Sequence, residues 1–311
     1  MNDCSVDAPS HLKALLLAVG VTVLWSSSWV LIKLGLQGAL PPLTFAGLRY
    51  TLAFLILLPL LLAHPVQRTA LRQLNAGQWR QLAALGLVFY TLTQGAQFVG
   101  LAHLPAAALT LLLNCTPIVV ALASPLFGHE PPVRLQWLGI AASAGGTALF
   151  LLPFDGLEIT RFGLFVGVFG VMANAGSALL GRHVNRHSGL PVLLVTTVSM
   201  GLGGVMLLVA GLATQGLGTL DGQQWLIVGW LAAINTALAF SLWNLSLRAL
   251  SALESSLING LMLPQIAVFA WVFLDEPLSL KQIAGLALVA CGGLLVQLHA
   301  HLPAWASRRK A

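Results

Sequence analysis

Charged residues are scarce in this chain. Aspartate, glutamate, lysine and arginine together make up only 8% of the 311 residues, whereas they make up about 25% of an average soluble domain. Hydrophobic residues account for 58%. A soluble protein of this length would lack the charged surface that keeps it hydrated. The composition therefore excludes a soluble globular protein and is typical of an integral membrane protein.

Cysteine and acidic residues are also few. The three cysteines, Cys4, Cys115 and Cys291, are far apart in the sequence, which argues against a disulfide framework or a zinc site. The nine acidic residues and most of the eight histidines lie in predicted loops or at the ends of apolar stretches. They assemble into no carboxylate pair, metal cluster or nucleophilic triad inside a membrane. The sequence therefore predicts neither an enzyme nor a bound metal or cofactor.

Long apolar runs are what the chain does have. A helix needs about 20 mostly apolar residues to cross the hydrocarbon core of a bilayer, and ten stretches approach this requirement. They cover residues 12–36, 43–63, 79–100, 105–127, 134–152, 162–181, 190–212, 223–247, 253–274 and 283–299. Because backbone groups in lipid must be satisfied within the segment, each stretch is expected to be a helix. The predicted fold class is an all-α integral membrane protein with ten transmembrane helices.

The two halves of the sequence repeat each other. Adding 146 to the residue number carries the pair Glu130-Pro131 onto Glu276-Pro277, and it aligns identical residues over two apolar stretches and the loop between them. The aligned pairs include Leu104 and Leu250, Ala106 and Ala252, Leu111 and Leu257, Gly139 and Gly285, and Gly146 and Gly292. We expect one five-helix repeat over residues 1–153 and a second over residues 154–311. Duplicated hydrophobic halves are typical of transporters, whose binding site lies where the repeats meet.

The basic residues predict the orientation in the membrane. They give a formal net charge of +6, but they are scattered over short loops and form no patch for nucleic acid. With a cytoplasmic N-terminus the inner side receives eleven of them: Lys13, Arg68, Arg72, Arg80, Arg134, Arg182, Arg186, Arg248, Arg308, Arg309 and Lys310. The outer side keeps four: Lys33, Arg49, Arg161 and Lys281. This bias predicts a bacterial inner-membrane protein with both termini in the cytoplasm, and the odd number of spans per half predicts that the halves are inverted.

Six of the predicted helices carry a face of amide, hydroxyl or aromatic side chains. Burying amides in lipid is costly, so these faces should turn toward other helices or a water-filled cavity. The candidate substrate-binding residues are Trp25, Trp29, Tyr90, Gln94, Gln97, Asn114, Asn174, Ser177, Asn235, Trp243, Asn259 and Met262. For any single residue, contact between helices is an equally good interpretation. Lys33 and Arg49 lie toward the outer helix ends, where we favour snorkelling over substrate contact.

Two prolines lie inside the fourth and ninth stretches, Pro117 in one half and Pro264 in the other. Each removes a helix hydrogen bond, so both helices should bend near the middle of the membrane. We hypothesise that these bends act as gates.

Several motifs resemble a known family. The first helix reads Leu24-Trp25-Ser26-Ser27-Ser28-Trp29 and then reaches Lys33, and the second runs from Pro42 through Arg49-Tyr50 to Ala53. With the interior proline and terminal glutamate of the fourth and ninth stretches, these residues resemble the ten-helix, EamA-like branch of the drug/metabolite transporter superfamily, although Ser26 replaces the usual glycine. The resemblance implies two inverted repeats around a central cavity and alternating access. Within the branch the chain is most similar to bacterial aromatic amino-acid exporters of the YddG type.

The predicted function is a secondary transporter that exports small metabolites, most of all aromatic or large neutral amino acids. Aromatic walls suit the side chain, and amides and hydroxyls can bond the ammonium and carboxylate groups. The expected partners are this substrate and membrane lipid, without nucleic acid, and a monomer is compatible with the sequence. The alternative is a proton-coupled exporter of lipophilic drugs or quaternary amines held by the aromatic rings. A non-transporting scaffold would need no polar cavity.

Ion coupling is not expected, because no carboxylate lies near a predicted midplane. The deepest acid is Glu254, about one helical turn from the cytoplasmic end of the ninth helix and close to Arg248. We interpret it as part of an interfacial ion pair and predict a facilitator.

The topology can be tested with reporter fusions. A C-terminal fusion to a reporter that works only in the cytoplasm should be active, because the basic residues hold both termini inside. Activity confined to a periplasmic reporter would contradict this orientation.

Overall fold

The computed structural model describes residues 9–35, 40–104, 109, 112–127, 132–151, 160–274 and 278–301. Every regular element in these ranges is helical, and they contain no strand. The elements of the first half are α1 (His11–Gly35), α2 (Pro42–Ala63), α3 (Pro65–Arg72), α4 (Ala76–Leu85), η1 (Gly86–Leu92), α5 (Thr93–His103), α7 (Thr116–Ala123), η2 (Ser124–Phe127) and α8 (Arg134–Leu151). Those of the second half are α9 (Arg161–His187), α10 (Val192–Gln215), α11 (Gly222–Ala232), η3 (Ala233–Leu238), α12 (Ala239–Ser246), α13 (Ala252–Gly260), α14 (Met262–Leu274) and α15 (Leu280–His301).

Each of the ten apolar stretches contains helix, as the sequence predicted. Six helical segments are long and apolar enough by themselves to cross a membrane: His11–Ser28, Pro42–Ala63, Ala76–Gly100, Arg161–His187, Val192–Gln215 and Gly222–Ser246. Thr116–Leu126 and Leu280–Leu295 are shorter apolar helices. The fold is therefore an all-helical membrane fold over the described ranges. The pairs Glu130-Pro131 and Glu276-Pro277 and the boundary at residues 153 and 154 lie outside them.

The third and eighth stretches share an unusual construction. Each begins with a capping box, Asn75 with Gln78 in one and Asp221 with Gln224 in the other, and adding 146 carries the first pair onto the second. About three turns later, each passes from α-helix into a π-helical segment, η1 or η3, and returns to α-helix. A π-helical turn contains an extra residue and frees backbone carbonyls from the α-helical hydrogen-bond pattern. The repeat in sequence is thus also a repeat in local structure.

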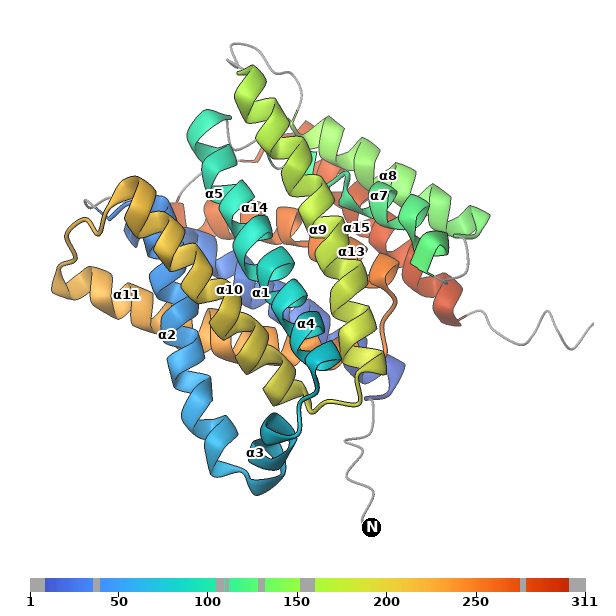
Figure 1. Ribbon diagram of the computed structural model, residues 1–311. Coiled ribbons are helices and arrows are strands. Elements are labelled where there is room, and N and C mark those ends of the chain that lie inside the picture. The colour runs from blue at the N-terminus through green and yellow to red at the C-terminus, as the bar shows by residue number, and fades with distance from the viewer. Residues whose placement is uncertain are drawn as a thin grey trace, which may run out of the picture.

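Corresponding helices of the two halves pack on each other. The most extensive helix contacts join α2 to α10 and α8 to α15, and Figure 1 shows these two pairs on opposite sides of the molecule with α5 and α9 between them.

Glycine allows the close approach of α8 and α15. A Cβ atom added to Gly146 would lie 2.6 Å from the carbonyl oxygen of Gly285, and one added to Gly292 would lie 2.5 Å from that of Gly139. Adding 146 carries Gly139 onto Gly285 and Gly146 onto Gly292, so the repeat exchanges the two contacts. Small residues let helices associate in lipid, where the hydrophobic effect contributes little.

The stretches that contain Pro117 and Pro264 are both interrupted just before the proline, where the sequence predicted a bend. A turn at residues 114–115 precedes α7, in which Pro117 is the second residue. A turn at Leu261 separates α13 from α14, in which Pro264 is the third residue. Proline is tolerated in the first turn of a helix because its missing N–H would have no helical partner there. The two interruptions face each other, since a Cβ atom on Gly260 would lie 3.3 Å from Oδ1 of Asn114.

Candidate functional site

A cavity lies between helices from both halves of the chain. It consists of three adjoining pockets with volumes of about 130, 110 and 40 Å³. Asn174 of α9 and Asn259 of α13 line all three pockets, so these form one hollow. The second pocket includes the interruptions of the broken helices, with Asn114, Pro117 and Gly260 in its wall. Binding sites of inverted-repeat transporters commonly lie at such discontinuous helices.

Most of the candidate residues converge on this cavity. The predicted residues in its wall are Trp25, Gln94, Gln97, Asn114, Asn174, Ser177, Trp243, Asn259 and Met262. They come from α1, α5, α9, α12, α13, α14 and the turn before α7. Faces that were separate in the sequence therefore meet in the fold.

Tyr90 and Asn235 lie behind the wall, and the side chain of Trp29 lies outside the described part of the chain. Tyr90 is fully buried and packs against Tyr50 and Phe240, with ring centroids 5.6 and 5.0 Å away. Phe89 lines the cavity instead. In a regular α-helix Tyr90 would share a face with the candidate residues Gln94 and Gln97. The extra residue of a π-helical turn shifts which side chains share a face.

The cavity contains a basic residue, Arg49, that the sequence predicted to lie toward an outer helix end. Arg49 of α2 lines the first pocket and is only 7% exposed. Its side chain therefore turns into the protein, whereas the sequence favoured snorkelling to the membrane interface. Its Nε donates to Oγ1 of Thr236 at 2.6 Å, and its Nη2 donates to the carbonyl oxygen of Asn235 at 3.1 Å. An arginine in the interior of an apolar stretch was itself a sequence signal, because buried charges in membranes are costly and commonly functional.

The π-helical segment η3 holds this part of the wall in place. The carbonyl oxygen of Asn235 accepts the Arg49 bond and also a bond of 3.1 Å from the indole Nε1 of Trp25. The Asn235 amide donates to the carbonyl of Leu24 and, at 3.2 Å, to Ser27. Thr236 turns its hydroxyl to the carbonyl of Leu231 five residues earlier, at 2.8 Å. Asn235 therefore orients two side chains of the cavity wall and joins α1 to the eighth stretch.

Aromatic rings form one side of the cavity. Trp25 lies 4.8 Å from Phe240 and 5.0 Å from Trp243 between ring centroids, and Phe89 lies 5.2 Å from Phe240. Such tilted and edge-to-face contacts make a stiff apolar surface. The amides of Gln94, Gln97, Asn174 and Asn259 line the first pocket together with these aromatic residues except Trp243.

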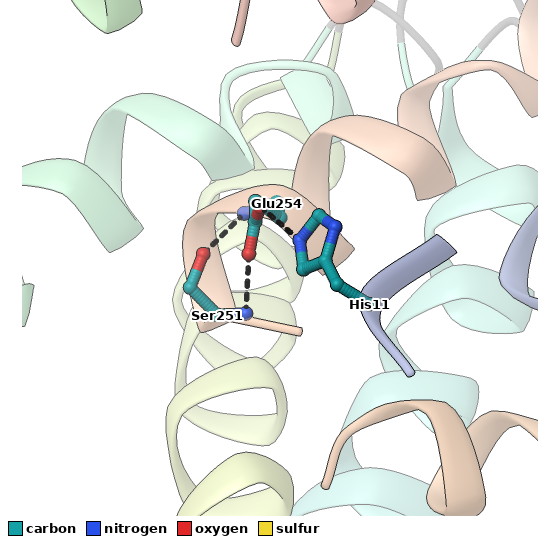
Figure 2. Close-up of polar contacts among 3 residues, drawn as sticks. All are labelled: His11, Ser251 and Glu254. Atoms are coloured by element: carbon teal, nitrogen blue, oxygen red, sulfur yellow. Dashed lines mark hydrogen bonds and ion pairs between the residues drawn. The ribbon is translucent and has the colours of Figure 1, made fainter. Parts of the chain in front are cut away.

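Glu254 stands apart from the cavity wall. Its Oε2 accepts a bond of 2.7 Å from the backbone N–H of Ser251, and the Ser251 hydroxyl accepts the Glu254 N–H at 3.1 Å. These bonds form the capping box of α13. Figure 2 shows His11 of α1 beside the same carboxylate, with Nε2 2.9 Å from Oε1. Glu254 thus caps α13 and pairs with α1, as expected of an interfacial acid, with His11 as a partner that the sequence did not reveal.

The described residues contain two acids, Asp221 and Glu254, and each caps a helix. Neither lines any of the three pockets. No group of three His, Cys, Asp or Glu that could hold a metal occurs in the part of the chain that the structure describes. The cavity therefore offers amides, hydroxyls, aromatic rings and one guanidinium.

Comparison with known proteins identifies the family. The profile of the EamA-like transporter family matches the chain twice, over residues 12–152 and 161–298. The chain belongs to the EamA-like transporter family. It is therefore a membrane transporter, which implies a small-molecule substrate and no enzymatic role.

Curated relatives and a solved structure agree with this membership. The transporter YvbV of Bacillus subtilis is 27% identical over 303 residues, which cover 93% of this chain and 92% of the relative. The inner membrane transporter YedA of Escherichia coli K12 is 27% identical over 90% of this chain and 89% of its own length. A probable amino-acid metabolite efflux pump of Salmonella typhimurium is 26% identical, covering 89% of this chain and 92% of the pump. A crystal structure with 19% identity superposes with a TM-score of 0.77 over 93% of this chain and 98% of its own, which supports the fold.

Cysteine labelling can test whether the cavity holds water. In a chain whose three native cysteines are replaced by alanine, Asn174→Cys should react rapidly with a hydrophilic maleimide, because Asn174 lines all three pockets. Asn235→Cys is the matched control and should react slowly, since Asn235 is 1% exposed. Equal, slow labelling at both positions would argue against a water-filled cavity.

Proposed function

We propose that this EamA-family transporter exports aromatic or large neutral amino acids from the bacterial cytoplasm. The observation that carries the proposal is the composition of the first pocket, whose lining combines aromatic rings with four amide side chains. An aromatic or aliphatic side chain would pack on Trp25, Phe89 and Phe240, while amide oxygens would accept bonds from the ammonium group. The probable amino-acid metabolite efflux pump of Salmonella typhimurium and the resemblance to YddG-type exporters support this substrate class.

The architecture that we propose has ten spans in two inverted repeats, with both termini in the cytoplasm. The packing of α2 on α10 and of α8 on α15 supports it, because an approximate two-fold axis brings corresponding helices together. The reciprocal glycine contacts of α8 and α15 support the same axis. Alternating access would then be a rocking of the two halves around the cavity.

Transport is proposed to run down the substrate gradient without ion coupling. A proton-coupled exporter needs a titratable group that proton and substrate occupy in turn. Among the described residues the pockets contain no carboxylate, and Glu254 is engaged with His11 and Ser251. The proton-coupled exporter of lipophilic cations is the alternative, and the guanidinium of Arg49 in the same pocket disfavours it by repelling a cation.

Proteoliposomes test both substrate and coupling. Vesicles loaded with radiolabelled phenylalanine, at equal pH and zero potential on both sides, should release it faster than protein-free vesicles. Glu254→Gln should retain this flux, because the amide can still cap α13 and the carboxylate carries no transported proton.

Two outcomes would overturn parts of the proposal. Flux that begins only with an imposed proton gradient and disappears in Glu254→Gln would make Glu254 a coupling site. Release of a quaternary amine, with no release of any amino acid, would favour the alternative substrate class.

Pro117 and Pro264 are proposed as gating residues, since each follows a helix interruption beside the cavity. Alanine at both positions supplies the N–H that proline lacks. If the interrupted helices then close into continuous ones, each N–H can form a helical hydrogen bond worth about 1 kcal/mol. If the moving helices must break these bonds, the barrier rises by about 2 kcal/mol and flux falls about 30-fold. Pro59→Ala in α2 is the matched control, because Pro59 lies inside a helix and lines none of the pockets. Undiminished flux in the double variant, at equal binding affinity, would leave the prolines as packing features.

A further inference from the structure

A buried guanidinium faces the cavity without an acidic partner. Arg49 is 7% exposed, and it forms no ion pair with Asp221 or Glu254, the two acids that the structure describes. A charge in this environment is costly unless an opposite charge or several hydrogen bonds compensate it. The ring of Tyr50, with its centroid 5.5 Å from Cζ, compensates only part of that cost.

The hydrogen bonds of Arg49 leave donors free on the cavity side. A guanidinium carries five N–H donors, and Nε and Nη2 each use one of theirs on Thr236 and Asn235. Within the part of the chain that the structure describes, Nη1 has no hydrogen-bond partner. This nitrogen is not fully buried, so it reaches the open space of the cavity. The two bonds to η3 fix the plane of the group while its outer edge stays available.

The chemistry that fits this edge is a carboxylate. A planar guanidinium held at one side presents parallel N–H groups that match the two oxygens of a carboxylate. The same pocket contains amides that can face an ammonium group and aromatic rings that can face a side chain. A phosphate fits less well, because its second charge would remain uncompensated with a single cation among the described lining residues.

We propose that Arg49 is the carboxylate-binding residue of this transporter and that its substrates must carry a free carboxylate. The Thr236 hydroxyl and the Asn235 carbonyl act as positioning groups that hold the guanidinium against η3. The inference rests on the proposed function in its choice of amino acids, but the requirement for a carboxylate holds for any substrate of this cavity.

Substrates that differ only in their polar end test the proposal. Proteoliposomes are loaded with phenylalanine, 3-phenylpropanoate, phenylalaninamide or phenethylamine, which share a phenyl ring, and the rates of release are compared after subtraction of protein-free leakage. The native protein should release the two carboxylates at least about tenfold faster than the two compounds without one, the size expected for a hydrogen bond to a charged group. Arg49→Met should abolish this preference, and Arg49→Lys should retain part of it.

Arg182→Met is the matched control. Arg182 is a second buried arginine, 6% exposed, and it lines none of the three pockets, so this variant should keep the native preference. Because the result is a ratio of substrates within one preparation, reduced folding of a variant does not imitate it.

The outcomes separate this inference from the proposed function. Release of 3-phenylpropanoate without phenylalanine would refute amino-acid export and support the role of Arg49. A native protein that prefers phenethylamine, or an Arg49→Met variant with the native preference, would overturn the role of Arg49. If Arg49→Met keeps the native preference, the role of Arg49 is only to hold α2 against η3.

Discussion

The carbonyl oxygen of Asn235 is the point on which the cavity wall depends. Within η3 this oxygen accepts the indole N–H of Trp25 and an N–H of the Arg49 guanidinium. These two bonds tie α1 and α2 to the eighth stretch and set the direction of two side chains of the cavity wall. π-helical turns are rare and frequently occur at functional sites. The matching position of η1 in the third stretch places Phe89 in the wall.

Packing at the periphery gives this wall a firm frame. The helices α8 and α15 approach so closely that no Cβ atom fits at Gly146, Gly285 or Gly292. Around Gly203 of α10, the backbone of Gly86 and the Cβ atom of Tyr90 leave equally little room. Close backbone contact supplies the dispersion energy that associates helices in lipid. In contrast, the helices around Asn114 and Gly260 are interrupted, and it is there that the cavity extends. The fold thus combines rigid glycine-rich pairs with broken helices at the centre.

The two described acids and the cation of the cavity occupy different parts of the molecule. Glu254 and Asp221 each cap a helix, whereas the described lining residues of the cavity include one cation and many neutral polar groups. The zwitterionic substrate that we propose would pair its carboxylate with this cation and its ammonium group with the neutral polar groups. Membership in the EamA-like transporter family agrees with a small-molecule cavity, and the arrangement of Arg49, the amides and the aromatic rings narrows the chemistry that the cavity accepts.

The sequence by itself determined the membrane class, the apolar stretches, the duplicated halves, the places where two helices break and nine residues of the cavity wall. These features are local, because a run of apolar residues, a capping box or a proline acts through its own neighbours. Tertiary structure decided the rest. Phe89 replaced Tyr90 in the wall because η1 shifts the helical register, and Arg49 turned inward because Thr236 and Asn235, nearly 190 residues later in the chain, offered it acceptors. Spacing within one helix cannot reveal such partners, since the free energy that holds them comes from contacts between helices that only the folded chain brings together.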